Sequence, residues 1–237
     1  MVFVPPPASL LQLRGVDFER ARTCAPDAKA IYDAFDASPA GQEDPNRCKA
    51  LLEFPDGGPV FWSAKMAVDA DGPPAGPGLP DGNELDPASG RPDTSFTFAD
   101  GGGLPSALIP YIVLPQSGPR SNRPFHPALA MGDLAVVIYR SKISPAICGD
   151  LGPYRLIGEA SIRVHENLRQ RGVPDPCKAR DAQGNCLKIL NESVAEDVLI
   201  FAFPSSALGP RLTLRNAERD IRKAALSRYN AFRGSGA

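Results

Sequence analysis

Apolar residues in this chain are concentrated in short runs that proline, glycine and polar residues interrupt. Runs of this length, rich in β-branched and aromatic residues, predict strands rather than helices. The clearest run is 61–68 (FWSAKMAV), in which alternate side chains point to opposite faces of a strand. Five further runs predict strands at 95–98, 107–114, 133–139, 142–148 and 198–203.

Helical periodicity is found mainly near the two ends of the chain. Residues 17–35 and 216–232 carry apolar side chains at helical spacing, and a shorter amphipathic helix is predicted from about 160 to 170. Strands and helices do not alternate, which disfavours a parallel doubly wound sheet. The pattern therefore predicts a mainly β (α+β) fold, a small six-stranded β-barrel with peripheral helices. We divide the chain into an N-terminal extension with a helix (1–48) and one main domain (49–237).

Composition narrows the class of protein. The chain has 237 residues, 43% of them hydrophobic, which is enough for one good core. Its net charge of −1 leaves no basic field for nucleic acid. No apolar run reaches the ~18 residues of a membrane span. The first residues, MVFVPPPASLLQLRG, do not resemble a signal peptide, because prolines interrupt them.

The five cysteines indicate the redox compartment in which the protein is found. Cys177 and Cys186 bracket a polar loop, and Cys24 and Cys48 flank a helical segment, so each pair could form a disulfide. Cys148 lies in an apolar strand, where we expect a buried free thiol. Two disulfides fit a secreted or periplasmic enzyme, whereas five reduced cysteines are the alternative. The spacings match no common zinc pattern.

Two carboxylates lie close together in the stretch 146–168, AICGDLGPYRLIGEASIRVHENL. Asp150 and Glu159 are nine positions apart, each follows a glycine, and we expect a turn at 151–153 to bring them together. A pair of acids on rigid elements is what glycoside hydrolysis requires, one as the acid and the other as base or nucleophile. The structural alternative is a turn residue at Asp150 and a helix-start residue at Glu159.

The string GDLGPYRLIGEASI resembles the signature of the endo-chitosanases of glycoside hydrolase family 75, fungal enzymes with bacterial relatives. Four more segments resemble the same family in the same order: 61–72 (FWSAKMAVDADG), 106–115 (SALIPYIVLP), 132–139 (GDLAVVIY) and 198–206 (VLIFAFPSS). The resemblance implies that Asp150 and Glu159 are the catalytic acids and that 49–237 is a chitosanase-like catalytic domain. It further implies inverting hydrolysis of chitosan, the polymer of glucosamine, by a barrel of the double-psi kind with no metal or cofactor.

Four other residues match family positions and are candidates for substrate binding. Asp69 and Asp71 occupy the place of an Asp-x-Asp motif and could bind glucosamine ammonium groups by charge-assisted hydrogen bonds. The alternative for this pair is a turn motif, either calcium-binding or purely structural. Lys65 and Tyr111 could line the cleft, although single strand residues of this kind are more often structural.

The sequence leaves the roles of the two acids open. A helix start at Glu159 would favour its ionised form and a role as base, whereas an apolar wall around it would favour the opposite.

We expect a monomer whose partner is chitosan or a related amino-sugar polysaccharide, with no nucleic acid and no membrane. Two other classes compete: a peptidase or transferase using Cys148 with His126 or His165, and a non-catalytic carbohydrate-binding barrel.

Overall fold

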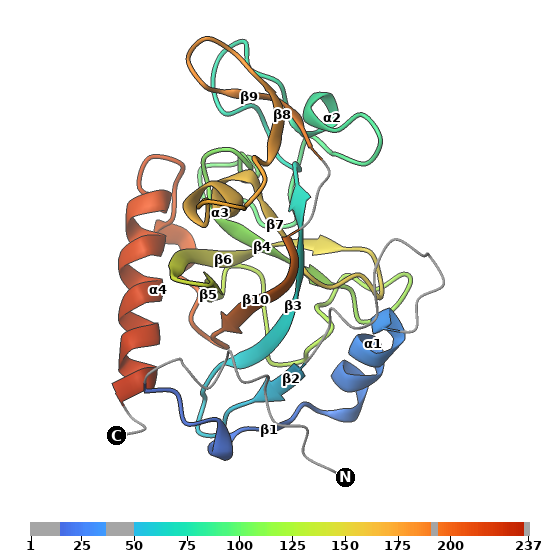
Figure 1. The fold of residues 1–237 in the computed structure, drawn as a ribbon, viewed down its shortest axis with the longest axis vertical. Coiled ribbons are helices and arrows are strands. Elements are labelled where there is room, and N and C mark those ends of the chain that lie inside the picture. The colour runs from blue at the N-terminus through green and yellow to red at the C-terminus, as the bar shows by residue number, and fades with distance from the viewer. Residues whose placement is uncertain (1–14, 37–49, 191–193, 235–237) are drawn as a thin grey trace.

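Six strands close into a mixed β-barrel (Figure 1). The structure, a computed structural model, describes residues 15–36, 50–190 and 194–234. Around the barrel the strand order is β3 (Val60–Asp69), β10 (Val194–Ala202), β5 (Leu134–Tyr139), β6 (Lys142–Gly152), β4 (Tyr111–Pro115) and β7 (Glu159–Ser161). β7 pairs in turn with β3, which closes the barrel. The pairs β3–β7 and β4–β6 are parallel and the others are antiparallel.

Both faces of the barrel wall are buried, which explains why the strands read as continuous apolar runs. In β5, Ala135 and Val137 belong to one core cluster, whereas Leu134, Val136 and Ile138 belong to a second. Two short strands, β1 (Arg22–Thr23) and β2 (Ala50–Glu53), extend the sheet beyond β3.

Two longer helices pack against the barrel from different sides (Figure 1). α4 (Ala217–Gly234) buries one face against the second cluster through Ile221, Ala225 and Tyr229. α1 (Pro26–Asp36) joins the first cluster, so the described part of the N-terminal segment shares the core of the barrel. The structure also contains the short helices α2 (Gly82–Leu85) and α3 (Ile162–Asn167), and 3-10 turns at Phe18–Arg20 and Gly209–Arg211.

The predicted fold class is confirmed, because the chain forms a small six-stranded barrel with peripheral helices. β3 contains the predicted strand 61–68, β10 contains the strand predicted over 198–203 except for Phe203, and α4 matches the predicted terminal helix. β5 and β6 form the predicted hairpin across Arg140 and Ser141. The division of the chain at residue 48 stays a prediction.

Four local predictions are wrong, because contacts distant in sequence override the local pattern. The helix predicted over 17–35 begins only at Pro26, a favoured first residue of a helix, and β1 precedes it. Residues 95–98 form no strand. The strand predicted over 107–114 begins only at Tyr111, after Pro110, and lies between β6 and β7. The helix predicted from about 160 begins after strand β7.

A hairpin projects above the barrel beside α2 (Figure 1). Its strands are β8 (Cys177–Arg180) and β9 (Cys186–Ile189), and the predicted disulfide between Cys177 and Cys186 joins them with a Cα–Cα distance of 5.6 Å. The hairpin and α2, with the loop that carries α2, form a lobe above the barrel (Figure 1). A third apolar cluster fixes this lobe to the end of β3. The cluster contains Val68, Ala70, Leu85, Ile162, Cys177, Cys186 and Ile189.

The other two cysteines in the described part of the chain, Cys24 and Cys148, are both free. Cys148 is a buried free thiol, as predicted. Cys24 is also a buried free thiol, and Cys48, its predicted partner, lies outside the described residues. In the described part of the chain, no helix has both the length and the apolar character of a membrane span.

Replacing both hairpin cysteines, Cys177→Ala with Cys186→Ala, should lower the free energy of unfolding by about 2–3 kcal/mol, because the unfolded chain regains the entropy of the open loop. Urea denaturation would measure the change. Wild type in reductant should match the double variant, and reductant should leave the variant unaffected. An unchanged denaturation midpoint in the variant would show that the apolar cluster alone holds the lobe.

Candidate functional site

A β-bulge at Gly149 determines where Asp150 points. Ile112 of β4 pairs with Cys148, and the next residue, Val113, pairs with Asp150, so Gly149 is the extra residue. In a regular strand Asp150 would share the face of Cys148, since side chains alternate. The bulge moves it to the opposite face, beside Val113. A Cβ on Gly149 would lie 2.5 Å from the Cβ of Tyr111, so the bulge requires glycine.

Glu159 reaches the same face from the other side of β4. In the register of the sheet it pairs with Val113 on β4 and with Ala67 on β3. Asp150 and Glu159 therefore flank Val113 with their Cα atoms about 10 Å apart, since two strand spacings separate them. A Cβ on Gly152 would lie 3.0 Å from Oε2 of Glu159, so the missing side chain leaves room for this carboxylate.

The two acids meet through sheet pairing and not through the predicted turn at 151–153. β6 continues to Gly152, and the turn follows at Tyr154 and Arg155. Glu159 also does not begin a helix, because it opens β7, and Ser161 is the N-cap of α3. The argument that a helix start keeps Glu159 ionised is therefore wrong.

Asp69 and Asp71 join this site from the end of β3. Oδ1 of Asp69 accepts hydrogen bonds from the Asp71 N–H (2.6 Å) and from the Tyr111 hydroxyl (3.2 Å). Oδ1 of Asp71 accepts the backbone N–H of Arg91 at 2.7 Å. Carboxylate oxygens of Asp69, Asp71 and Asp150 lie within 4.8 Å of one another. Three predicted site residues thus form one cluster, with Glu159 close enough to act on it electrostatically.

The crowding of acids changes their charge states. Burial raises the pKa of Asp69 well above its ordinary value, and the charges of Asp71, Glu159 and Asp150 raise it further. Burial also raises the pKa of Asp71 to about 7, although the hydrogen bond from the Arg91 backbone opposes the shift. The site therefore holds protons at neutral pH in place of a full set of negative charges.

Lys65 and Tyr111 are buried and do not reach the surface. Lys65 is 1% exposed and Tyr111 is fully buried. The Tyr111 hydroxyl donates at 2.7 Å to the backbone oxygen of Asp71, and burial raises the pKa of this phenol well above its ordinary value. Tyr111 is thus a support for the Asp69–Asp71 turn, and both residues are buried where the sequence predicted a cleft lining.

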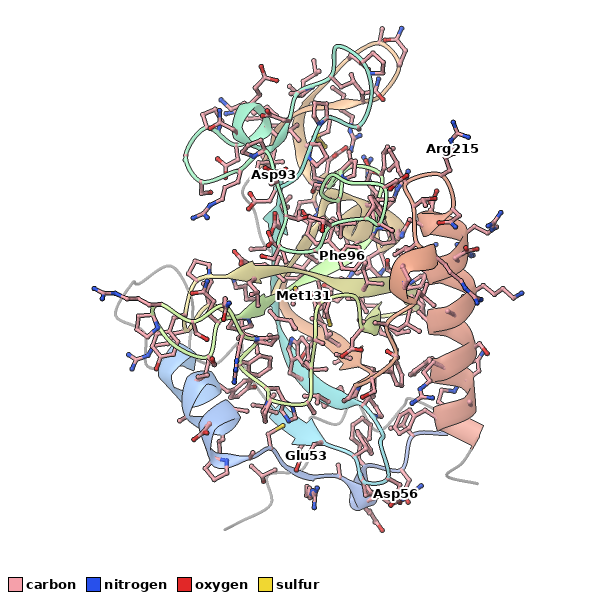
Figure 2. All side chains as sticks on the ribbon, turned by 180° about the vertical axis from the view of Figure 1, so that it is seen from behind. Glu53, Asp56, Asp93, Phe96, Met131 and Arg215 are labelled. Atoms are coloured by element: carbon pink, nitrogen blue, oxygen red, sulfur yellow. A yellow bond between two sulfur atoms is a disulfide. The ribbon has the colours of Figure 1, made fainter. Side chains whose placement is uncertain are left out.

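Sequence analysis missed Ser95, which directly contacts the site. Its backbone N–H (2.8 Å) and its hydroxyl (2.5 Å) both donate to Oδ1 of Asp150. β5 pairs with β6 only as far as Ile147, and beyond this point the segment after Asp93 lies along β6, where the Phe96 N–H donates to the oxygen of Gly149 at 2.9 Å. Figure 2 shows this segment passing from Asp93 in the lobe to Phe96 beside the barrel. No sequence signal marks Ser95, because half of its contact comes from backbone.

The competing nucleophile, Cys148, is fully buried, and burial raises the pKa of its thiol well above its ordinary value. Both histidines have other partners. His165 Nε2 lies 2.9 Å from the oxygen of Ala67, and burial lowers its pKa to about 4. His126 Nε2 lies 3.3 Å from Glu53. These contacts disfavour a cysteine-dependent mechanism.

Within the described ranges, two groups of side chains have ligand atoms close enough to share a metal ion: Cys24 with Glu53 and His126, and the aspartate cluster. In the first group the Ala128 N–H donates to His126 Nδ1 at 3.3 Å, so the neutral ring carries its proton on Nε2, facing Glu53. Hydrogen bonds thus account for the positions of His126 and Glu53, and backbone donors bind Asp69, Asp71 and Asp150. We assign a metal to neither.

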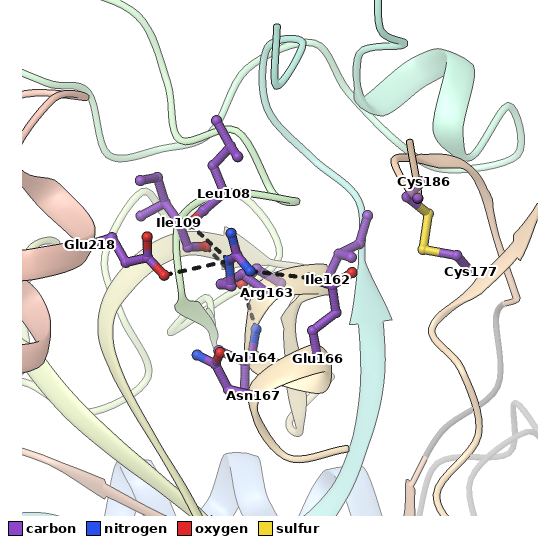
Figure 3. Close-up of polar contacts among 12 residues, drawn as sticks. Leu108, Ile109, Ile162, Arg163, Val164, Glu166, Asn167, Cys177, Cys186 and Glu218 are labelled. Carbon is purple, nitrogen blue, oxygen red and sulfur yellow. Dashed lines mark hydrogen bonds and ion pairs between the residues drawn. A yellow bond between two sulfur atoms is a disulfide. The ribbon is translucent and has the colours of Figure 1, made fainter. Parts of the chain in front are cut away.

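A cavity of about 190 Å³ separates the lobe from the barrel, and its lining includes Leu79, Leu85 and Arg180. Arg163 of α3 also lines it, and donates to the oxygen of Leu108 at 3.2 Å (Figure 3). The second described cavity, about 320 Å³, lies at the end of α4. Asp150 and Glu159 line neither of these two cavities.

Comparison with models of known protein families gives no match for this chain, and comparison with curated protein sequences gives none either.

The raised pKa of Asp71 predicts a pH-dependent stability. The folded state holds this proton up to about pH 7, whereas an ordinary aspartate in the unfolded chain loses it near pH 3.8, so stability falls as pH rises between these values. Asp71→Asn cannot ionise and should raise Tm above that of wild type at pH 8, with little difference at pH 4. Thermal unfolding at both pH values would test this, with the exposed Asp100→Asn as control. A lower Tm of Asp71→Asn at pH 8 would contradict the burial argument.

Proposed function

We propose that this protein is an endo-acting glycoside hydrolase that cleaves β-1,4 linkages between glucosamine units of chitosan or a related amino-sugar polymer. The observation that carries the proposal is the placement of Asp150 and Glu159 on one face of the barrel wall, on either side of Val113. The same two residues are those to which the family resemblance gives catalytic roles.

The family resemblance implies an inverting mechanism. Inverting enzymes need about 6.5–9.5 Å between the two carboxyl groups for a water molecule, whereas retaining enzymes need about 5–5.5 Å. The Cα atoms of Asp150 and Glu159 are two strand spacings apart, about 10 Å, which leaves room for the wider separation of the carboxyl groups. One carboxyl group then protonates the leaving oxygen while the other activates water on the opposite face of the sugar.

The neighbouring aspartates suit a cationic substrate. Asp71 is half-buried beside Asp150, and an ammonium group near it would be favoured by a charge-assisted hydrogen bond. A positive charge would also lower the cost of ionising the crowded acids. These features support an amino sugar as the substrate class. The disulfide between Cys177 and Cys186 is consistent with a secreted protein.

A non-catalytic polysaccharide-binding barrel is the second candidate. The observation that favours it is the position of the two described cavities, since the acids line neither. In that case the acids would bind the polymer and release no product.

Wild type should release reducing ends from soluble chitosan, and Asp150→Asn and Glu159→Gln should each lower the rate by at least about 100-fold, since each removes a general acid or base. A reducing-sugar assay measures the rate, and proton NMR of the first product should show the α-anomer that inversion of a β linkage gives. Circular dichroism would confirm that both variants are folded.

Matched controls are Asp100→Asn in an exposed turn and Glu218→Gln at the start of α4, both of which should keep wild-type activity. Chitosan binding without turnover by wild type would support the binding barrel. If wild type neither binds nor cleaves chitosan at any degree of acetylation, this substrate class is refuted.

A further inference from the structure

The hydrogen bonds around Asp150 distinguish its two oxygens. Oδ1 accepts three donors: the backbone N–H of Ser95, the hydroxyl of Ser95, and the N–H of Leu151 at 2.8 Å. An oxygen with three donors has no lone pair free for a proton. Proton transfer at this residue therefore falls to Oδ2, and it takes place beside the carboxyl of Asp71, which also hydrogen-bonds to Asp150.

Ser95 is held in place for this contact by the edge of β6. Its hydroxyl oxygen accepts the Leu151 N–H at 3.1 Å while its hydrogen goes to Asp150. The next residue, Phe96, bonds to Gly149 at 2.9 Å, so the segment is anchored on both sides of the aspartate. The hydroxyl thus has a defined direction, although Ser95 itself is exposed.

We propose that Ser95 is the positioning residue that makes Asp150 the general base of the pair, with Oδ2 as the working oxygen and Glu159 as the proton donor. This inference rests on the proposed function. Oδ2 of Asp150 takes a proton from water as the water oxygen bonds to the anomeric carbon. Glu159 gives its proton to the glycosidic oxygen as the bond from that oxygen to the anomeric carbon breaks. The products are an α-hemiacetal and an alcohol, and solvent returns the proton from Asp150 to Glu159.

The test is the pH profile of kcat for Ser95→Ala, which removes the hydroxyl and keeps the backbone donor. Loss of a donor to a charged group should move the ionisation of Asp150 upward by about one pH unit. If Asp150 is the base, the acidic limb of the profile moves up while the alkaline limb stays. KM should stay within about twofold of wild type, since the change affects proton transfer and not uniform binding.

Two further variants separate positioning from general structure. Ser95→Thr retains the hydroxyl and should restore the wild-type profile. Ser89→Ala is the matched control, because the Ser89 hydroxyl makes the same 2.5 Å bond to a carboxylate, that of Asp86, away from the acid cluster. If the alkaline limb moves in Ser95→Ala, Asp150 is the acid of the pair. If neither limb moves, Ser95 has a purely structural role. Both results overturn the inference.

A readout that does not need turnover separates this inference from the proposed function. Carbon-13 NMR titration of the Asp150 carboxyl, assigned with Asp150→Asn, should show a higher midpoint in Ser95→Ala than in wild type. An unchanged midpoint would refute the link between Ser95 and Asp150 whether or not the protein is active. A raised midpoint together with an inactive wild type would refute the assigned catalytic roles and leave the contact intact.

Discussion

The register of β4 between β6 and β7 is the constraint on which the site depends. Val113 pairs with Asp150 on one side and with Glu159 on the other, so a single strand residue sets the separation of the two acids. A slip of one residue in either pairing would move an acid to the opposite face. The bulge at Gly149 and the bare backbone at Gly152 are the local departures that this register requires.

The acid cluster is unfavourable for stability, and the structure surrounds it with donors. Burying several carboxylates together raises the free energy of their charged forms. Tyr111 and backbone N–H groups from the segment after β3 offset part of that cost by donating to Asp69, Asp71 and Asp150. A site of this kind persists only where the rest of the fold supplies the stability, and here two apolar clusters fill both faces of the barrel wall.

The lobe above the barrel is held by different means. Its own apolar cluster is small, and the disulfide limits the freedom of the unfolded hairpin. Arg180 bonds to Asp175 at 2.7 Å and to Glu166 at 3.0 Å, which connects the hairpin to α3. Partly exposed ion pairs of this kind contribute little individually, so the lobe depends on the network and the cross-link together.

The sequence by itself determined the class of the fold, and it singled out Asp150 and Glu159 as the candidate acids. Apolar runs such as 61–68 and 198–203 are strands because both of their faces are buried, and α4 follows from its spacing. The acids were found from their types and from the resemblance, and the disulfide from the polar loop between its cysteines. Only the tertiary structure decided how the acids meet. Pairing across β4, the bulge at Gly149 and the Ser95 contact join residues far apart in the chain through backbone groups, which carry no mark in the sequence. Lys65 and Tyr111, which the sequence assigned to a cleft, are both buried, and Tyr111 supports the Asp69–Asp71 turn.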